Sequence, residues 1–253
     1  MERPFLTAGA FVLAAAILAG CVAPSRSTPH ITVAAASNLS SVCQRLGRDF
    51  EAGTGVHVDY SFAATGNLTR QIENDAPFDV FLAADVEHVA GLESKGLLVA
   101  GSRAVYARGR LVLWMPSESR VALTSLAELE SPQVRCVAVA QPSVAPYGAA
   151  AVESLHALGL WEQVGPKIVY AESIGMAKQF AVSGNADACF TAYSLVMRDG
   201  GRIIDVPERL HRPLDQALAI LQRSPSREPA RRFTEFVLGP KGSEIFEQYG
   251  YRK

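Results

Sequence analysis

The stretch Ile31–Leu39, with the sequence ITVAAASNL, contains the pattern on which the rest of the chain is built. Ile31–Ala36 is a short run of apolar and small residues, which predicts a buried strand that leads directly into Ser37. Apolar residues then recur at every fourth position, at Val42, Leu46 and Phe50. This spacing predicts a helix with one buried face, so Ser37 is expected at a helix N-cap. There a serine either simply caps the helix or helps the unpaired N–H groups to hold an oxyanion.

Three further helix starts follow strand-like segments and repeat this arrangement. Thr65 precedes Gly66 at one helix start, and it supplies both a hydroxyl and an N–H group. At the other two, Tyr147 follows Pro146 and Ile174 follows Ser173, so each is expected to supply only its backbone N–H. Repetition makes a shared anion site a better interpretation than separate capping. Such a site would bind an anion without charged side chains.

Tyr193 ends a strand-like segment and is the fifth candidate ligand-binding residue. Its phenolic O–H would add a donor to the same site. The alternative is a tyrosine at a strand end that buries its ring and keeps its hydroxyl in water.

Strand-like and helix-like segments alternate from Ile31 onward, which is typical of βαβ units and of a parallel sheet covered on both faces. The segments form two sets, one before and one after about Arg110. The expected strands are Ile31–Ala36, Val56–Phe62, Asp79–Ala84, Leu111–Trp114, Arg135–Ala140, Lys167–Ala171 and Ala188–Tyr193.

The C-terminal part of the chain indicates how the two halves connect. Gln216–Leu221 is strand-like, and two helical segments follow at Arg227–Leu238 and Lys241–Tyr251. If this part returns to the first half, the chain crosses between halves near 107–110 and near 214–218. We therefore expect an α/β fold of two doubly wound lobes joined by a two-strand hinge, with the ligand between the lobes. The expected lobes are 31–107 with 217–253, and 108–216.

The first 20 residues read as an export signal rather than as part of the fold. Arg3 precedes the apolar run Phe5–Leu18, which is too short to span a membrane but suits the core of a signal peptide. Leu18–Cys21 resembles the lipobox of bacterial lipoproteins, in which the cysteine is lipidated; an ordinary secretory signal is the alternative. Residues 21–30 would then be a lipidated Cys21 and its tether, and the protein an exported, membrane-anchored lipoprotein.

Charge and cysteine content limit the possible partners. The net charge is −1 and no basic run occurs, so nucleic acid is not an expected partner. Besides Cys21 the chain has Cys43, Cys136 and Cys189; the last two either pair or are buried as free thiols. The five histidines are scattered, so neither a protein-held metal ion nor a cofactor is expected.

An enzyme is the first competing interpretation, with Ser37 or Ser143 as a nucleophile. The chain has no Gly-x-Ser-x-Gly motif and no histidine next to an expected strand end, so catalysis is not predicted. Two alternatives are not enzymes. One is a binding protein for sulfate, an organic anion or a metal complex, and the other is a tethered sensor or adaptor.

Several segments together resemble the periplasmic molybdate-binding proteins of ABC transporters, the ModA family. The resemblance covers nearly the whole mature chain, which is expected to begin at Cys21. It is carried by Ile31–Leu39, Ser61–Ala63, Leu68–Glu73, Ala76–Asp85, Gly239-Pro240, Ile245-Phe246 and Tyr249-Gly250. It implies a type II periplasmic binding protein fold, a monomer that binds molybdate or tungstate, and delivery to an ABC permease.

The resemblance also implies a set of contacts to the oxyanion, which is the only metal-containing group expected. They are the hydroxyl and N–H of Ser37, the same groups of Thr65, the N–H of Tyr147, the N–H of Ile174 and the hydroxyl of Tyr193. Three positions depart from a common family pattern: Thr65 replaces a serine, Tyr147 a small residue and Ile174 a valine. All three keep the required donor. The Tyr147 side chain either lines the mouth of the cleft or turns outward.

Overall fold

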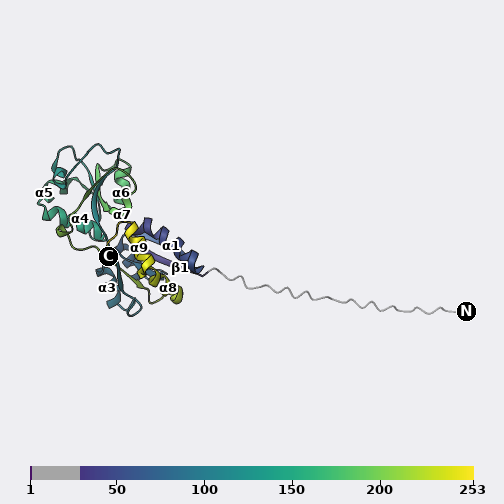
Figure 1. Cartoon of the computed structure of the whole chain (residues 1–253). Helices are drawn as coiled ribbons and strands as arrows, with labels where there is room; N and C mark the ends of the chain where they lie inside the picture. Colours follow the sequence, from purple (N-terminus) through teal and green to yellow (C-terminus); the bar gives the residue numbers. More distant parts are fainter. Residues whose placement is uncertain (2–28) are drawn as a thin grey trace.

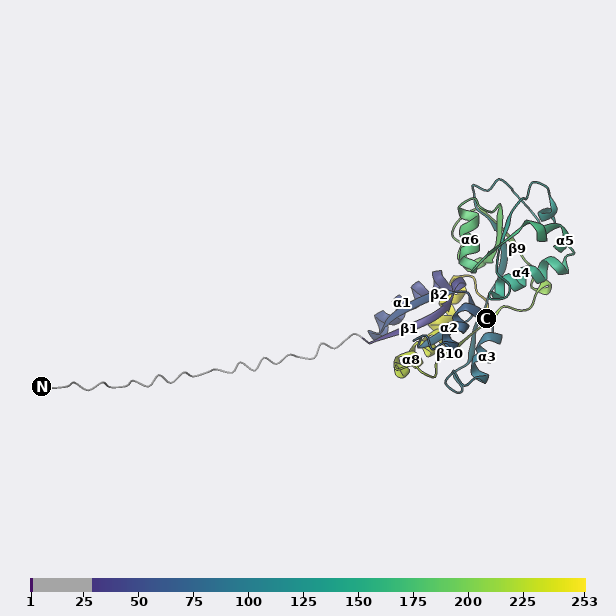
Figure 2. The ribbon, with the colours of Figure 1, turned by 180° about the vertical axis from the view of Figure 1, so that it is seen from behind.

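The computed structural model describes residues 29–253 together with Met1, and it shows two lobes (Figure 1, Figure 2). The predicted signal peptide, the lipidation site at Cys21 and most of the tether lie outside the described residues. No helix in the described part of the chain is both long enough and apolar enough to cross a membrane. The C-terminus lies where the two lobes meet.

Lobe I contains a five-stranded sheet in the order β2-β1-β3-β10-β4. Strand β1 pairs in parallel with β2 and β3, whereas β10 is antiparallel to both β3 and β4. The strands are β1 (His30–Ala36), β2 (His57–Ala63), β3 (Val80–Leu82), β4 (Ala104–Arg108) and β10 (Asp215–Ile220). The helices are η1 (Ser37–Leu39), α1 (Ser40–Thr54), α2 (Thr65–Glu73), α3 (Glu87–Ser94), α8 (Arg227–Leu238) and α9 (Pro240–Gln248).

Lobe II repeats the arrangement with the order β7-β6-β8-β5-β9. Strand β6 pairs in parallel with β7 and β8, and β5 is antiparallel to β8 and β9. The strands are β5 (Leu111–Met115), β6 (Val137–Ala140), β7 (Ile168–Ala171), β8 (Ala188–Ala192) and β9 (Arg202–Asp205). The helices are η2 (Leu126–Glu130), α4 (Pro146–Ala157), α5 (Trp161–Val164), η3 (Gly165–Lys167), α6 (Ile174–Val182), α7 (Tyr193–Val196) and η4 (Glu208–Leu210).

Both sheets are mixed, so the prediction of parallel sheets is correct only for three strands of each. The antiparallel pairs arise because the chain leaves lobe I through β4 and returns through β10, and these neighbouring strands run in opposite directions. Strands β4 and β9 and helix α3 were not predicted. An apolar run shows that a strand is buried but not in which direction it runs. β4 contains the exposed Val105, and β9 has an exposed polar residue at each end.

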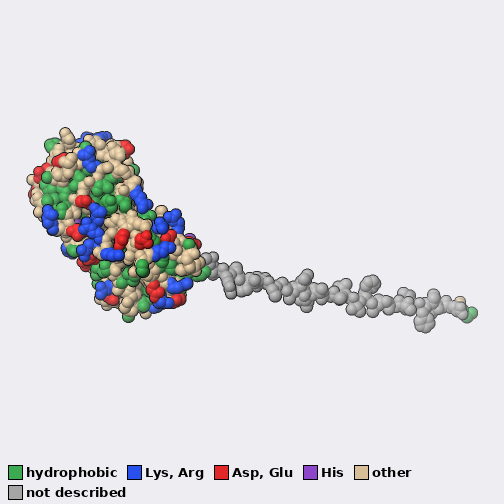
Figure 3. All heavy atoms as spheres, in the orientation of Figure 1, with side chains coloured by type: hydrophobic (Ala, Val, Ile, Leu, Met, Phe, Trp, Pro, Cys, Tyr) green, Lys and Arg blue, Asp and Glu red, His purple; other side chains and the backbone are tan. Residues whose placement is uncertain are grey.

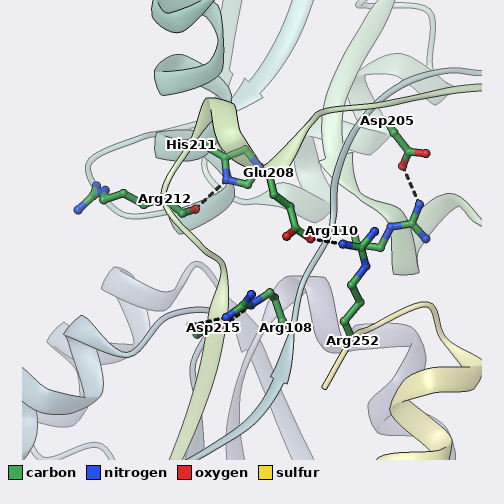
Figure 4. Close-up of polar contacts among 8 residues, drawn as sticks. All are labelled: Arg108, Arg110, Asp205, Glu208, His211, Arg212, Asp215 and Arg252. Atoms are coloured by element: carbon green, nitrogen blue, oxygen red, sulfur yellow. Dashed lines mark hydrogen bonds and ion pairs between the residues drawn. The ribbon is translucent and has the colours of Figure 1, made fainter.

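The hinge consists of two crossings. The first is short, because β4 ends at Arg108 and β5 begins at Leu111. The second runs from the end of β9 to Asp215, where β10 begins opposite Arg108. The Arg108 Nε lies 2.6 Å from the Asp215 Oδ1, and these residues join the two crossings on the lobe I side (Figure 4). Residues 215 and 216 thus pair with lobe I, whereas the predicted boundary assigned them to lobe II.

The hydrophobic core forms two clusters, and in lobe I they cover opposite faces of the sheet: Val33 and Leu82 belong to one, and Ala34 and Phe81 to the other. In lobe I the ring of Phe50 from α1 packs edge-on against Phe233 from α8, with centroids 5.2 Å apart. Both rings are almost fully buried. This contact fixes the C-terminal helices α8 and α9 to lobe I. The described fold, from residue 29 onward, therefore begins and ends in the same lobe, as the crossing pattern requires.

The three cysteines of the described region, Cys43, Cys136 and Cys189, are free thiols. Of the two alternatives for Cys136 and Cys189, the structure thus shows free thiols rather than a disulfide. Cys43 and Cys189 are completely buried, whereas Cys136 is partly exposed. Burial raises the pKa of the Cys43 and Cys189 thiols well above its usual range, so neither forms a thiolate at neutral pH.

We expect iodoacetamide at pH 8 to alkylate Cys136 in the folded protein at least about ten times faster than Cys43 or Cys189, because only the thiolate reacts and only Cys136 is accessible. Peptide mapping by mass spectrometry measures the three rates. Unfolding in urea should make them equal. Equal rates in the folded protein would contradict the packing described above.

Candidate anion-binding site

Four helix starts meet at a small cavity between the lobes. The cavity has a volume of about 200 Å³ including its opening, and η1 and α2 reach it from lobe I while α4 and α6 reach it from lobe II. Its lining residues are small, apolar or neutral and polar. They are Ala36, Ser37, Asn38, Ala64, Thr65, Ala84, Ala145, Pro146, Tyr147 and Ile174. Four of the five predicted ligand-binding residues therefore lie together.

Ser37 is the first residue of η1, and the N-cap position belongs to Ala36. The predicted cap is therefore displaced by one residue, because the strand ends at Ala36 and the first turn is a tight 3-10 turn. The Ser37 hydroxyl is not used to cap this turn. It lies at the cavity with 8% of the residue exposed, where it is free to bind an acceptor.

Thr65 is the first residue of α2, and it is 1% exposed. Its Oγ1 accepts a hydrogen bond from the backbone N–H of Ala84 at 3.1 Å. A hydroxyl that accepts one bond still has its own hydrogen to donate. The Ala84 contact thus holds the Thr65 hydroxyl at the cavity, where its hydrogen remains available to a bound oxyanion.

Tyr147 and Ile174 reach the cavity from lobe II at the starts of α4 and α6. Pro146 occupies the first turn of α4, where its missing N–H costs nothing, and Tyr147 follows it. Helix α6 begins at Ile174, and the side chain of Ser173 caps it by accepting the N–H of Met176 at 3.3 Å. The first N–H groups of a helix lack partners within the helix, so both backbones present donors here.

The Tyr147 side chain is buried in the protein, with 1% of the residue exposed. Its hydroxyl accepts a hydrogen bond from Nε2 of Gln216, in the hinge strand β10, at 2.9 Å. Burial raises the pKa of the Tyr147 phenol well above its usual range, so the hydroxyl stays neutral. This burial contradicts the predicted outward orientation of the side chain.

Tyr193 is the one predicted site residue that does not line the cavity. It is the first residue of α7 rather than the last of a strand. The Arg110 guanidinium lies 4.1 Å from the centroid of its ring, and Gly250 packs so closely that a Cβ there would lie 2.3 Å from the ring. The ring is held between the hinge and the C-terminal segment, and Tyr193 is not among the residues that line the cavity.

Asn38 lines the cavity but was not predicted as a site residue. Its Nδ2 donates to Oε1 of Gln216 at 2.9 Å and to the hydroxyl of Tyr251 at 3.0 Å. Its adjacency to Ser37 in the same helix start is a local signal that could have identified it. Its side-chain partners are 178 and 213 positions away in the chain, and no local pattern indicates them.

A larger hollow of about 600 Å³ lies next to the cavity and shares Ala145 and Pro146 with it. Charged side chains line this hollow, namely Asp85, Glu87, His88, Glu153 and Arg212. Charges of both signs also gather on the surface near the junction of the lobes (Figure 3). Three carboxylates disfavour an anion in the hollow. The smaller cavity, without charged side chains, is therefore the better oxyanion site.

Comparison with known proteins identifies the family. The family model described as bacterial extracellular solute-binding protein matches residues 31–252. The chain belongs to this family. Two curated relatives of this solute-binding protein are each described as "Molybdate-binding protein ModA". The relative from Azotobacter vinelandii is 39% identical over 94% of this chain and 96% of its own length. The relative from Rhodobacter capsulatus is 36% identical over 97% and 96%.

The fold of this solute-binding protein is also that of a solved molybdate-binding protein. The periplasmic molybdate-binding protein of Azotobacter vinelandii superimposes with a TM-score of 0.83 at 31% identity. The match covers 88% of this chain and 99% of that protein. The expected two-lobed binding-protein fold is thus confirmed.

Proposed function

We propose that this protein binds molybdate between its lobes and delivers it to an ABC import permease. The observation that carries the proposal is the meeting of four helix starts at one cavity lined only by neutral residues. The names of its full-length relatives support molybdate as the ligand. The role is binding and not catalysis, and tungstate is expected to bind as well because it is the same tetrahedral dianion in nearly the same size.

The proposed donors are the hydroxyl and N–H groups of Ser37 and Thr65 and the N–H groups of Tyr147 and Ile174. The N–H of Asn38 joins them because Asn38 also lines the cavity at a helix start. Tyr193 is left out because its ring is held elsewhere. Each charge-assisted hydrogen bond contributes about 1.5–3 kcal/mol, and the helix starts add a favourable field.

Selectivity follows from the type of donor. A lysine or arginine would attract any anion over a long range, whereas neutral donors act only at contact distance. Sulfate has shorter bonds to its oxygens than molybdate, so it cannot reach all donors of a cavity that is closed around the larger ion. Phosphate carries a proton at neutral pH, and this cavity has no carboxylate to accept it.

The cellular context is part of the same proposal. The protein is exported by the signal at residues 1–20 and anchored through a lipidated Cys21. It acts as a monomer, the organisation in which two lobes open and close around one ligand and then dock onto a permease. Mass spectrometry of the protein from bacterial membranes tests the anchor, because lipidated Cys21 would be the first residue of the mature chain.

A thermal-unfolding titration of residues 22–253 tests the ligand. We expect molybdate or tungstate, at a hundred times its Kd, to add about 2.7 kcal/mol to the free energy of unfolding, and sulfate and phosphate to add nothing measurable. A shift with sulfate equal to that with molybdate would identify a general oxyanion binder instead. No shift with any of the four ions would contradict the proposed function.

A further inference from the structure

Gln216 is a fully buried amide in the hinge strand β10, and all its polar atoms have partners. Its Oε1 lies 2.9 Å from Nδ2 of Asn38 and 3.0 Å from the hydroxyl of Tyr106, and its Nε2 donates to the hydroxyl of Tyr147 at 2.9 Å. The register of β10 against β4 shifts between Gln216 and Ala217. The Gln216 amide therefore lies at an irregularity in the pairing of β10 with β4, next to the hinge.

The partners of Gln216 include two residues of the anion cavity, one from each lobe. Asn38 belongs to η1 of lobe I, and Tyr147 belongs to the start of α4 in lobe II. A single hinge side chain thus joins the two sides of the cavity. The same network continues across the lobes, because the Ser194 hydroxyl of lobe II lies 3.1 Å from the Asn38 carbonyl oxygen.

The first hinge crossing meets the same pair of side chains at Gly109. A Cβ at Gly109 would lie 2.0 Å from the Tyr147 hydroxyl oxygen and 2.5 Å from Nε2 of Gln216. The backbone of Gly109 is not in the left-handed region, so its conformation does not require glycine. Glycine is required because a side chain at this position has no space. Both crossings therefore pack against the Tyr147 hydroxyl, while the backbone of Tyr147 faces the cavity.

We propose that Gln216 is a positioning residue for anion binding: it holds the Tyr147 hydroxyl at the hinge and so places the start of α4 against Asn38 in the closed protein. The inference rests on the proposed function. Rotation about the hinge moves α4 relative to η1, so this bridge favours the closed state, in which donors of both lobes reach one anion. Anion binding and the hinge angle are thereby linked through Tyr147.

The test uses two substitutions that remove the bridge and keep the shape of the core. Tyr147→Phe deletes only the hydroxyl and keeps the backbone N–H, and Gln216→Met replaces the amide by an apolar chain of similar length. We expect each to raise the Kd for molybdate roughly five-fold and to reduce the ligand-induced compaction seen by small-angle X-ray scattering. The double variant should match the weaker-binding single variant, because both changes remove the same bond.

Tyr60→Phe is the matched control. The Tyr60 hydroxyl in lobe I is buried and has no hydrogen-bond partner among the described residues, so its loss should leave the Kd unchanged. If the bridge is purely structural, Tyr147→Phe and Gln216→Met will have lower melting temperatures without anion, but their Kd for molybdate will stay within two-fold of wild type. That result would overturn the inference. Losses that multiply in the double variant would overturn it too. Absence of molybdate binding by the wild-type protein would instead remove the proposed function, and this inference with it.

Discussion

Replacement of Gly66 by valine should weaken molybdate binding by at least about 100-fold while both lobes remain folded. Gly66 is the second residue of α2 in lobe I, and its N–H donates to the carbonyl oxygen of Val144 in lobe II at 2.9 Å. A Cβ at this position would lie 3.0 Å from the Val144 Cα and 3.2 Å from its carbonyl oxygen. The two methyl groups of valine reach further and collide with backbone.

The collision occurs only when the lobes are closed, because Gly66 and Val144 belong to different lobes. The variant protein therefore relieves it by opening at the hinge, at little cost to either core. An open protein presents the donors of η1 and α2 but not those of α4 and α6 to the same anion. A population restricted to the open state loses affinity by the factor by which closure is disfavoured.

Calorimetric titration with molybdate measures this loss, and circular dichroism confirms that both lobes are folded. Gly91→Val in α3 is the matched control, since a Cβ at Gly91 meets no atom within 4 Å. Replacement of glycine by valine raises helix propensity in both variants, so the control isolates the contact between the lobes. Affinity of the Gly66 variant within ten-fold of the control would show that binding does not need the closed arrangement.

The double variant Ser37→Ala with Thr65→Val should lose molybdate binding by roughly 150-fold or more. Each substitution removes a hydroxyl donor to a dianion, and two charge-assisted hydrogen bonds contribute about 3–6 kcal/mol together. Thr65→Val also leaves the Ala84 N–H without its acceptor, which lowers the stability of lobe I by about 1–3 kcal/mol. Ser37→Ala alone carries no such cost and should weaken binding by about ten-fold.

The control is a pair of hydroxyl deletions on the same lobe that are remote from the cavity. The hydroxyls of Thr54 and Ser94 donate to carbonyl oxygens of their own helices, at 2.7 and 2.8 Å. The Thr54 hydroxyl also accepts the N–H of Val56 at 3.2 Å, so its loss matches the loss of the Ala84 contact in Thr65→Val. Thr54→Val with Ser94→Ala should bind molybdate as wild type does. If the Ser37 and Thr65 double variant also keeps its affinity, the ligand depends on other groups, and an organic anion or metal complex becomes the better proposal.

Four of the five candidate site residues line one cavity, and their grouping could be predicted because a helix start after a strand is a local property of the sequence. Ser37 and Thr65 follow parallel strands of lobe I, and Tyr147 and Ile174 stand at helix starts that follow parallel strands of lobe II. The carboxyl ends of parallel strands share one edge of a sheet, so the residues that follow them are brought together. The donors at these positions are backbone N–H groups or short hydroxyl side chains, so the backbone conformation alone largely decides where they lie.

Tyr193 lies outside the cavity lining because its position is not decided locally. Its proposed contact depended on where a long side chain points, and that is decided by Gly250 and Arg110, which are distant in the chain. Strand β8 ends at Ala192, and Tyr193 begins α7, so its ring turns toward the C-terminal segment. Strands β4 and β9 were missed because the apolar run of each is short and ends at a polar residue.

The sequence by itself determined the alternation of strands and helices, the two crossings and the neutral donors at four helix starts. These depend on periodicity and on backbone N–H groups that any folded version of the chain would present at those positions. Only the tertiary structure decided the antiparallel hinge strands, the seating of Tyr193 and the inward Tyr147 hydroxyl bonded to Gln216. The reason is physical: a buried polar side chain must find its partner wherever the fold supplies one, and for Tyr147 that partner is 69 residues away.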